Sequence, residues 1–99
     1  PPLPDIYRGD EYRLRGCQSV VHFAAERKGD VIHFHAGSDA AIVQGLIALL
    51  IRVYSERTAA EILSTDANFL AEIGLDSHLS ATRKNGLASM LSAIKASAG

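Results

Sequence analysis

Cysteine, methionine and tryptophan are scarce in this sequence: its 99 residues include one cysteine, Cys17, one methionine and no tryptophan. A single cysteine excludes an internal disulfide, so nothing in the covalent framework points to an oxidising compartment. One thiol also cannot hold an iron–sulfur cluster, and it cannot form the Cys-x-x-Cys pair that disulfide exchangers use.

A dominant charge and a long apolar run are missing too. Ten basic residues oppose 11 acidic ones, so the net charge is −1 and no global field favours nucleic acid or an anionic membrane. The longest apolar run, residues 46–51, is far too short to cross a bilayer, and no signal or transit peptide is visible. We therefore expect a cytoplasmic protein with no nucleic-acid or membrane partner.

Hydrophobic residues make up 47% of the sequence, which suits one domain over residues 1–99. A period of two between Glu11 and Ala36 predicts three strands. With Gly29-Asp30 as a turn, paired positions of the last two strands sum to 59. In that register, four apolar residues share the buried face of the sheet: Phe23, Ala25, Ile32 and Phe34. The other face carries His22, His33 and His35.

Helical patterns follow Gly37. Ser38 is a suitable N-cap and Asp39 a suitable first-turn residue for a very apolar helix over residues 40–54. Further helices are expected from the capping box Thr58-Ala59-Ala60-Glu61, over residues 66–74, and from Ser80 onward. The order predicts an α+β fold, in which helices cover one face of a three-stranded antiparallel sheet.

The segment Gly16-Cys17-Gln18-Ser19 interrupts the strand pattern and allows two interpretations. A lone cysteine is commonly a small buried hydrophobe. However, this segment holds no other apolar residue, so it suits a surface loop, where backbone N–H groups and Arg13 or Arg15 would favour the thiolate. We favour a reactive thiol at Cys17.

Two other polar sets are candidates for chemistry. His22, His33, His35 and His78 could act as bases, but no Cys-His signature of a nucleophilic enzyme is legible, and the first three suit a solvated strand face better than an incidental metal site. Arg83 and Asn85 begin the last helix, where a cation such as Arg83 suggests a carboxylate or a partner elsewhere. The chemistry that remains for a solitary surface thiolate is to accept a group from a donor molecule and to transfer it to an acceptor.

Three motifs in order resemble the SufE family of sulfur-acceptor proteins: Gly16-Cys17-Gln18-Ser19, Ser38-Asp39-Ala40-Ala41-Ile42-Val43-Gln44-Gly45-Leu46-Ile47-Ala48, and His78-Leu79-Ser80-Ala81-Thr82-Arg83-Lys84-Asn85-Gly86-Leu87. The resemblance implies a fold similar to SufE and to IscU-type scaffold proteins. It also implies that Cys17 accepts sulfur from the persulfide of a PLP-dependent cysteine desulfurase, for iron–sulfur cluster assembly. The PLP belongs to that partner, so no cofactor or metal is expected here.

The resemblance further places Asp39 and Arg83 near the acceptor loop and the desulfurase-facing surface. We expect Gly16, as a hinge, and Gln18, Ser19 and Asn85 to support the loop and partner binding. Three positions depart from the family pattern: His22 for tryptophan, Gly37 for aspartate and Gln44 for lysine. An N-terminal helical segment of the family is also expected to be missing before the Pro-Leu-Pro stretch.

The expected partners are a SufS-like or CsdA-like desulfurase and a downstream sulfur acceptor or cluster scaffold. The sequence leaves open whether the chain forms a homodimer. Two alternatives have no sulfur transfer. One is an adaptor that binds a desulfurase and tunes it; the other is a redox-sensing thiol protein.

Overall fold

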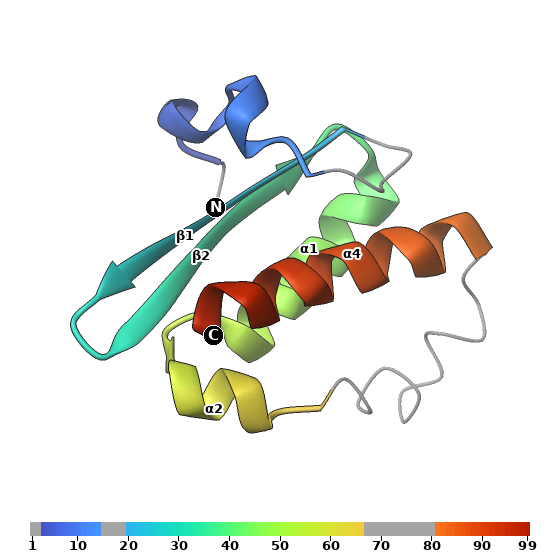
Figure 1. Cartoon of the computed structure of the whole chain (residues 1–99). Helices are drawn as coiled ribbons and strands as arrows, with labels where there is room; N and C mark the ends of the chain where they lie inside the picture. Colours follow the sequence, from blue (N-terminus) through green and yellow to red (C-terminus); the bar gives the residue numbers. More distant parts are fainter. Residues whose placement is uncertain (1–2, 15–19, 67–80) are drawn as a thin grey trace.

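The computed structural model describes residues 3–14, 20–66 and 81–99, with residues 81–83 described by their backbone alone. Its sheet lies between two layers (Figure 1): helices α1 (Ala41–Tyr54) and α4 (Ala81–Ala98) pack on one side. Two short 3-10 turns, η1 (Asp5–Tyr7) and η2 (Asp10–Tyr12), lie on the other. The predicted α+β fold is confirmed. Within the described ranges, no helix is long and apolar enough to span a membrane.

Strands β1 (Val21–Lys28) and β2 (Val31–Ser38) form an antiparallel hairpin in the predicted register. Glu26 pairs with His33 and Ala24 with His35, so paired positions sum to 59. Gly29 closes the turn at φ 61°, a left-handed conformation that glycine adopts without steric cost.

The third strand differs from the expectation. Glu11 to Leu14 does not form a full strand: Tyr12 N–H donates to Gly9 O (3.1 Å) in the turn η2, and only Arg13 bridges to His22 of β1. The strand beside β2 is instead β3 (Arg57–Thr58), and the sheet order is β1-β2-β3. Local turn bonds that begin at Gly9 compete successfully with a strand whose alternation spans only four residues.

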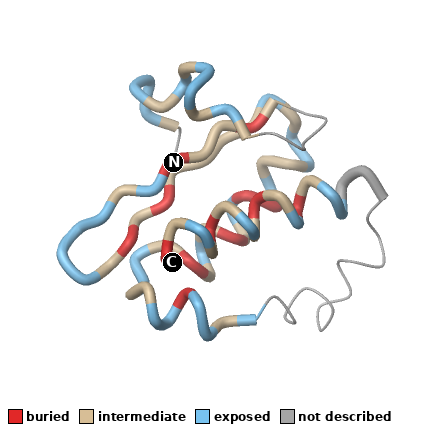
Figure 2. The backbone as a smooth tube through the Cα atoms, in the orientation of Figure 1, coloured by how far each residue is buried: buried red, intermediate tan, exposed pale blue. Residues whose placement is uncertain are grey.

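The core lies between the sheet and helices α1 and α4 (Figure 2). Ile32 and Phe34 are buried as predicted, and Phe23 packs against them. Ala25 is exposed, contrary to the expectation, whereas Ala24 on the histidine face is 6% exposed. The turns η1 and η2 contact β1 and lie on the histidine face, opposite the helices (Figure 1), which accounts for the burial of Ala24. The helices contribute Leu46, Ile47, Leu50, Tyr54, Leu87, Met90 and Ile94 to the core.

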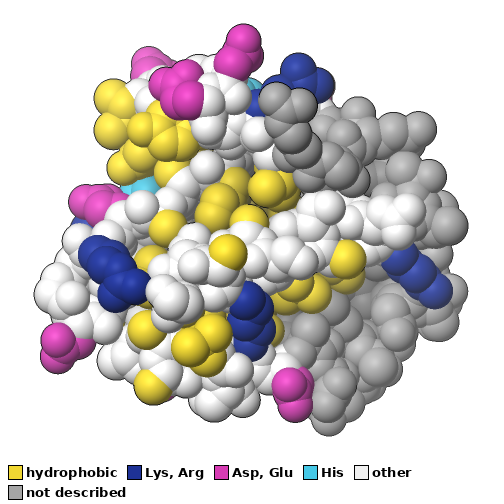
Figure 3. All heavy atoms as spheres, in the orientation of Figure 1, with side chains coloured by type: hydrophobic (Ala, Val, Ile, Leu, Met, Phe, Trp, Pro, Cys, Tyr) yellow, Lys and Arg dark blue, Asp and Glu magenta, His cyan; other side chains and the backbone are white. Residues whose placement is uncertain are grey.

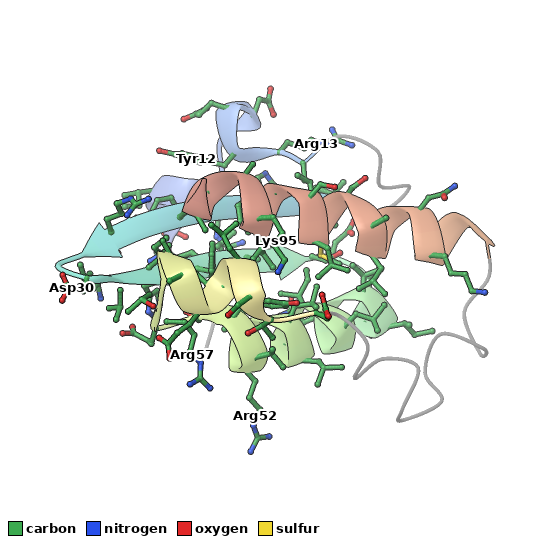
Figure 4. All side chains as sticks on the ribbon, turned by 60° about the horizontal axis from the view of Figure 1, so that its bottom comes forward. Tyr12, Arg13, Asp30, Arg52, Arg57 and Lys95 are labelled. Carbon is green, nitrogen blue, oxygen red and sulfur yellow. The ribbon has the colours of Figure 1, made fainter. Side chains whose placement is uncertain are left out.

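The short helix α2 (Ala59–Ser64) confirms the predicted capping box. The Thr58 hydroxyl accepts from Glu61 N–H, and the Glu61 carboxylate accepts from Thr58 N–H (2.9 Å). At the other end, Lys95 of α4 lies against α2 (Figure 4) and its Nζ donates to the carbonyls of Ile62 (2.5 Å) and Thr65 (2.6 Å). The helix expected over residues 66–74 falls mostly outside the described residues.

Candidate functional site

The residues that flank the candidate thiol segment lie at one end of the sheet. Cys17, Gly16, Gln18 and Ser19 lie outside the described residues, but both flanks are placed. Leu14 N–H donates to Val21 O (2.8 Å), and Arg13 bridges to His22. Figure 4 shows Tyr12 and Arg13 just ahead of this segment. The two described flanks therefore meet at the end of β1 that lies away from the Gly29 turn.

The junction of β2 and α1 lies at the same end, because Val21 pairs with Ser38. Ser38 does not cap α1 as predicted: Ala40 is the N-cap, without a side-chain cap hydrogen bond. The Ser38 hydroxyl instead accepts from Ala40 N–H (3.2 Å), and the Gln44 side-chain oxygen accepts from Ser38 N–H (2.8 Å). Gln44 thus ties the first turn of α1 to the strand end, and it leaves Asp39 exposed between them.

A hollow of about 280 Å³ opens at this junction. Asp39 and His22 line it together with Val20, which follows the candidate loop in sequence. The three positions that depart from the SufE pattern, His22, Gly37 and Gln44, all lie in its wall. The remaining lining comes from the N-terminal segment and the strand end: Leu3, Arg8 and Ser38.

The two candidates in α4 are not brought to this hollow by any described contact. Asn85 is exposed near the start of α4 and is not among the described residues that line the hollow. The side chain of Arg83 and the whole of His78 lie outside the described residues. Of the predicted partner-binding residues, the structure therefore places Asp39 beside the flanks of the thiol segment.

The histidines on the sheet face are paired with carboxylates. His35 Nε2 lies 3.0 Å from Glu26 Oε1, and His33 Nδ1 meets Glu56 Oε1. The rings of His33 and His35 are 4.4 Å apart, centroid to centroid, and His22 lies toward the hollow. Among the residues that the structure describes, no three metal-ligating side chains are placed to share an ion.

The pair of His35 and Glu26 has an electrostatic signature. The hydrogen bond from His35, with Lys28 and both histidines nearby, holds the pKa of Glu26 below its ordinary value of 4.5. Sequence reasoning missed Glu56, and it missed Tyr7, whose ring stacks on His35 with centroids 4.6 Å apart. An aromatic residue in an irregular lead-in and a glutamate in a turn carry no periodic signal, so neither could be assigned to this face.

The comparison with protein families decides the relationship. The family model SufE, described as the Fe-S metabolism associated domain, matches residues 1–98. The chain belongs to the SufE family. This confirms the resemblance seen in the three motifs and associates the SufE domain here with Fe–S metabolism.

Two curated proteins similar to this chain carry the name uncharacterized SufE-like protein. One SufE-like protein of Rhizobium meliloti (strain 1021) is 39% identical over 103 residues, 99% of this chain and 74% of that protein. Another, of Rhizobium etli, is 38% identical over 100 residues, 96% of this chain and 68% of that protein.

A solved structure shares the fold. The solution structure of a hypothetical protein from Thermus thermophilus matches with a TM-score of 0.80 at 21% identity, over 99% of this chain and 72% of that one. The likeness shows the architecture alone.

Proposed function

We propose that this SufE-family protein accepts sulfane sulfur on Cys17 from the persulfide of a PLP-dependent cysteine desulfurase. It then passes the sulfur to a downstream acceptor or scaffold for iron–sulfur cluster assembly. The observation that carries the proposal is the family match over residues 1–98 in a chain with a single thiol. The placement of both flanks of Cys17 beside the exposed Asp39 supports it.

The transfer is a thiol exchange with no net redox change. The Cys17 thiolate attacks the outer sulfur of the desulfurase persulfide, a new S–S bond forms at Cys17, and the desulfurase cysteine leaves as a thiolate. The new persulfide can give up its outer sulfur to the next thiolate by the same step. PLP stays with the desulfurase and takes part only in releasing sulfur from free cysteine.

Intact-mass measurement after incubation with a desulfurase, PLP and cysteine tests the proposal. We expect species heavier by whole sulfur atoms, reversed by dithiothreitol and absent from Cys17→Ser. Wild-type protein that gains no sulfur beside an active desulfurase would contradict the proposal.

The two alternatives give different outcomes in the same assay. An adaptor keeps stimulating cysteine desulfuration as Cys17→Ser, whereas a sulfur acceptor loses that stimulation. A redox-sensing thiol forms sulfenic acid with peroxide and takes up no sulfur from the desulfurase.

A further inference from the structure

Residues 3–14 form a strap over the histidine face of the sheet, opposite the helices (Figure 1). Acidic side chains gather at the top of the view in Figure 3, and the turns of the strap, which lie at the top of the same view in Figure 1, carry Asp5, Asp10 and Glu11. Inside the strap, Tyr7 meets Tyr12 edge to face, with ring centroids 5.2 Å apart. Arg8 folds the strap on itself, because it donates to Leu3 O (3.0 Å) and pairs with Asp5 (3.1 Å).

The middle of the strap is fastened by one ring stack. Tyr7 lies on His35 with an interplanar angle of 28°. The His35 side chain is only 15% exposed and is fixed from two further sides: by the Glu26 carboxylate and by the His33 ring, which Glu56 holds in turn. The contacts of His35 with Glu26 and His33 do not involve the strap, so a variant that removes the Tyr7 ring leaves them in place.

The beginning of the strap rests on a glycine. A Cβ added at Gly37 would lie 3.2 Å from Cβ of Leu3, closer than most real contacts of this kind. The absence of a side chain at Gly37 thus lets Leu3 seat against the end of β2. Gln44, whose amide oxygen would be 3.7 Å from the same point, closes the seat from α1.

The end of the strap is the near anchor of Cys17. Leu14, bonded to Val21 O, is the last described residue before the segment that contains the thiol. Nothing but three peptide bonds separates Leu14 from Cys17. The backbone therefore connects the strap directly to the segment that contains the thiol.

We propose that the strap positions the acceptor cysteine, with Tyr7 and His35 as positioning residues that hold it on the sheet. The docking of the strap stands on its own contacts, whereas its effect on sulfur transfer rests on the proposed function. With Tyr7 released, Leu14 loses its fixed place and Cys17 meets small reagents more freely but meets a desulfurase persulfide in poorer orientation.

The test compares Tyr7→Ala with Tyr7→Phe, which keeps the stack, and with Ile6→Ala, a matched truncation of a residue in η1 that is 72% exposed. Three quantities are measured: hydrogen exchange of the Leu14 amide by NMR, the rate at which iodoacetamide alkylates Cys17, and sulfur loading by a desulfurase. For Tyr7→Ala we expect exchange and alkylation to rise about three- to tenfold, the factor that an aromatic stack represents, while loading falls. Both control variants should match wild type.

Gly37→Ala disturbs the other end of the strap and serves as a second variant if Tyr7→Ala folds poorly. It should change the three quantities in the same directions. Unchanged Leu14 exchange and unchanged Cys17 alkylation in folded Tyr7→Ala would overturn the inference. Absence of sulfur loading in wild type would instead overturn the proposed function and leave the exchange result standing.

Discussion

Glu56 places its carboxylate on Nδ1 of His33 from a left-handed backbone conformation, φ 61°. Among the described residues it is the one non-glycine with positive φ. Its N–H donates to Ile32 O (2.8 Å), so backbone and side chain both tie the turn after α1 to β2. A conformation that costs energy is kept here because two contacts to the same strand depend on it.

The first prediction separates the backbone cost of Glu56 from its carboxylate. Glu56→Gly and Glu56→Ala both lose the contact with His33, but only alanine keeps the steric penalty of the left-handed region. We expect the glycine variant to be more stable than the alanine variant by about 1 kcal/mol in free energy of unfolding. Urea titration measures the difference. An alanine variant at least as stable as the glycine variant would mean that the turn relaxes to negative φ.

The second prediction concerns acid. Hydrogen bonds from His35 to Glu26, and from the Thr58 backbone and hydroxyl to Glu61, hold the pKa of each glutamate below 4.5. A lowered folded-state pKa contributes stability that is complete above the unfolded value and is lost as pH falls through the folded one. The urea midpoint should therefore decline below about pH 4.5.

Variants show whether these two glutamates cause the decline. The stability of Glu26→Gln and Glu61→Gln should depend less on pH below that point than that of wild type. Asp30→Asn, at the exposed hairpin turn, should leave the slope unchanged. A decline equally steep in all three variants would assign it to other carboxylates.

The third prediction tests Lys95. Its ammonium donates to three carbonyls at the end of α2, those of Ile62, Leu63 and Thr65, and lies 5.3 Å from the centroid of the Tyr54 ring. Lys95→Met should lower the free energy of unfolding by about 1.5–3 kcal/mol, the range for hydrogen bonds to charged groups. Lys84→Met, at an exposed position of the same helix, should change it by less than about 0.5 kcal/mol. Equal effects at both positions would show that Lys95 contributes no more than a surface lysine.

The fourth prediction tests the surface beside the thiol segment. Asp39 is exposed in the wall of the hollow, so reversing its charge should disturb partner docking without disturbing the core. Asp39→Lys should load sulfur more slowly than wild type by about tenfold at low salt, and the difference should shrink as ionic strength rises. Asp10→Lys on the strap is the matched reversal, and it should load normally. A salt-independent defect in Asp39→Lys would place its effect in local structure.

The hairpin and the capping box could be predicted because their determinants are local: a Gly-Asp turn fixes one register, and Thr58 and Glu61 are three residues apart. The third strand could not, because Arg57–Thr58 is too short for any period and is positioned by the turn at Glu56. For the strap, the sequence predicts only an irregular lead-in and a strand from Glu11. Its packing depends on ring contacts between Tyr7 and His35, which lie 28 residues apart in sequence (35 − 7).

For the candidate site, the part that could be predicted best is the pairing of the two strands that lead to it. Val21 opposite Ser38 brings Asp39 beside the described flanks of the Cys17 segment, and its role in partner binding stays a prediction. The roles expected for the other site residues stay predictions too: the side chains of Gly16, Cys17, Gln18, Ser19 and Arg83 fall outside the described residues, and Asn85 is described without a contact to the hollow. The prediction of Ser38 as a cap is wrong because the Gln44 amide, six residues further along the chain, accepts from the strand-end N–H instead.

The hydrogen bond from Leu14 to Val21 also sets a limit on travel. Cys17 is three residues beyond Leu14, and an extended chain covers at most about 3.6 Å per residue, so its Cα stays within about 11 Å of that tether. A segment this short cannot carry Cys17 into a deep cavity of another protein unless the sheet itself comes close to that protein. Under the proposed function, a sulfur donor must therefore dock at this end of the sheet before its sulfur can pass to Cys17.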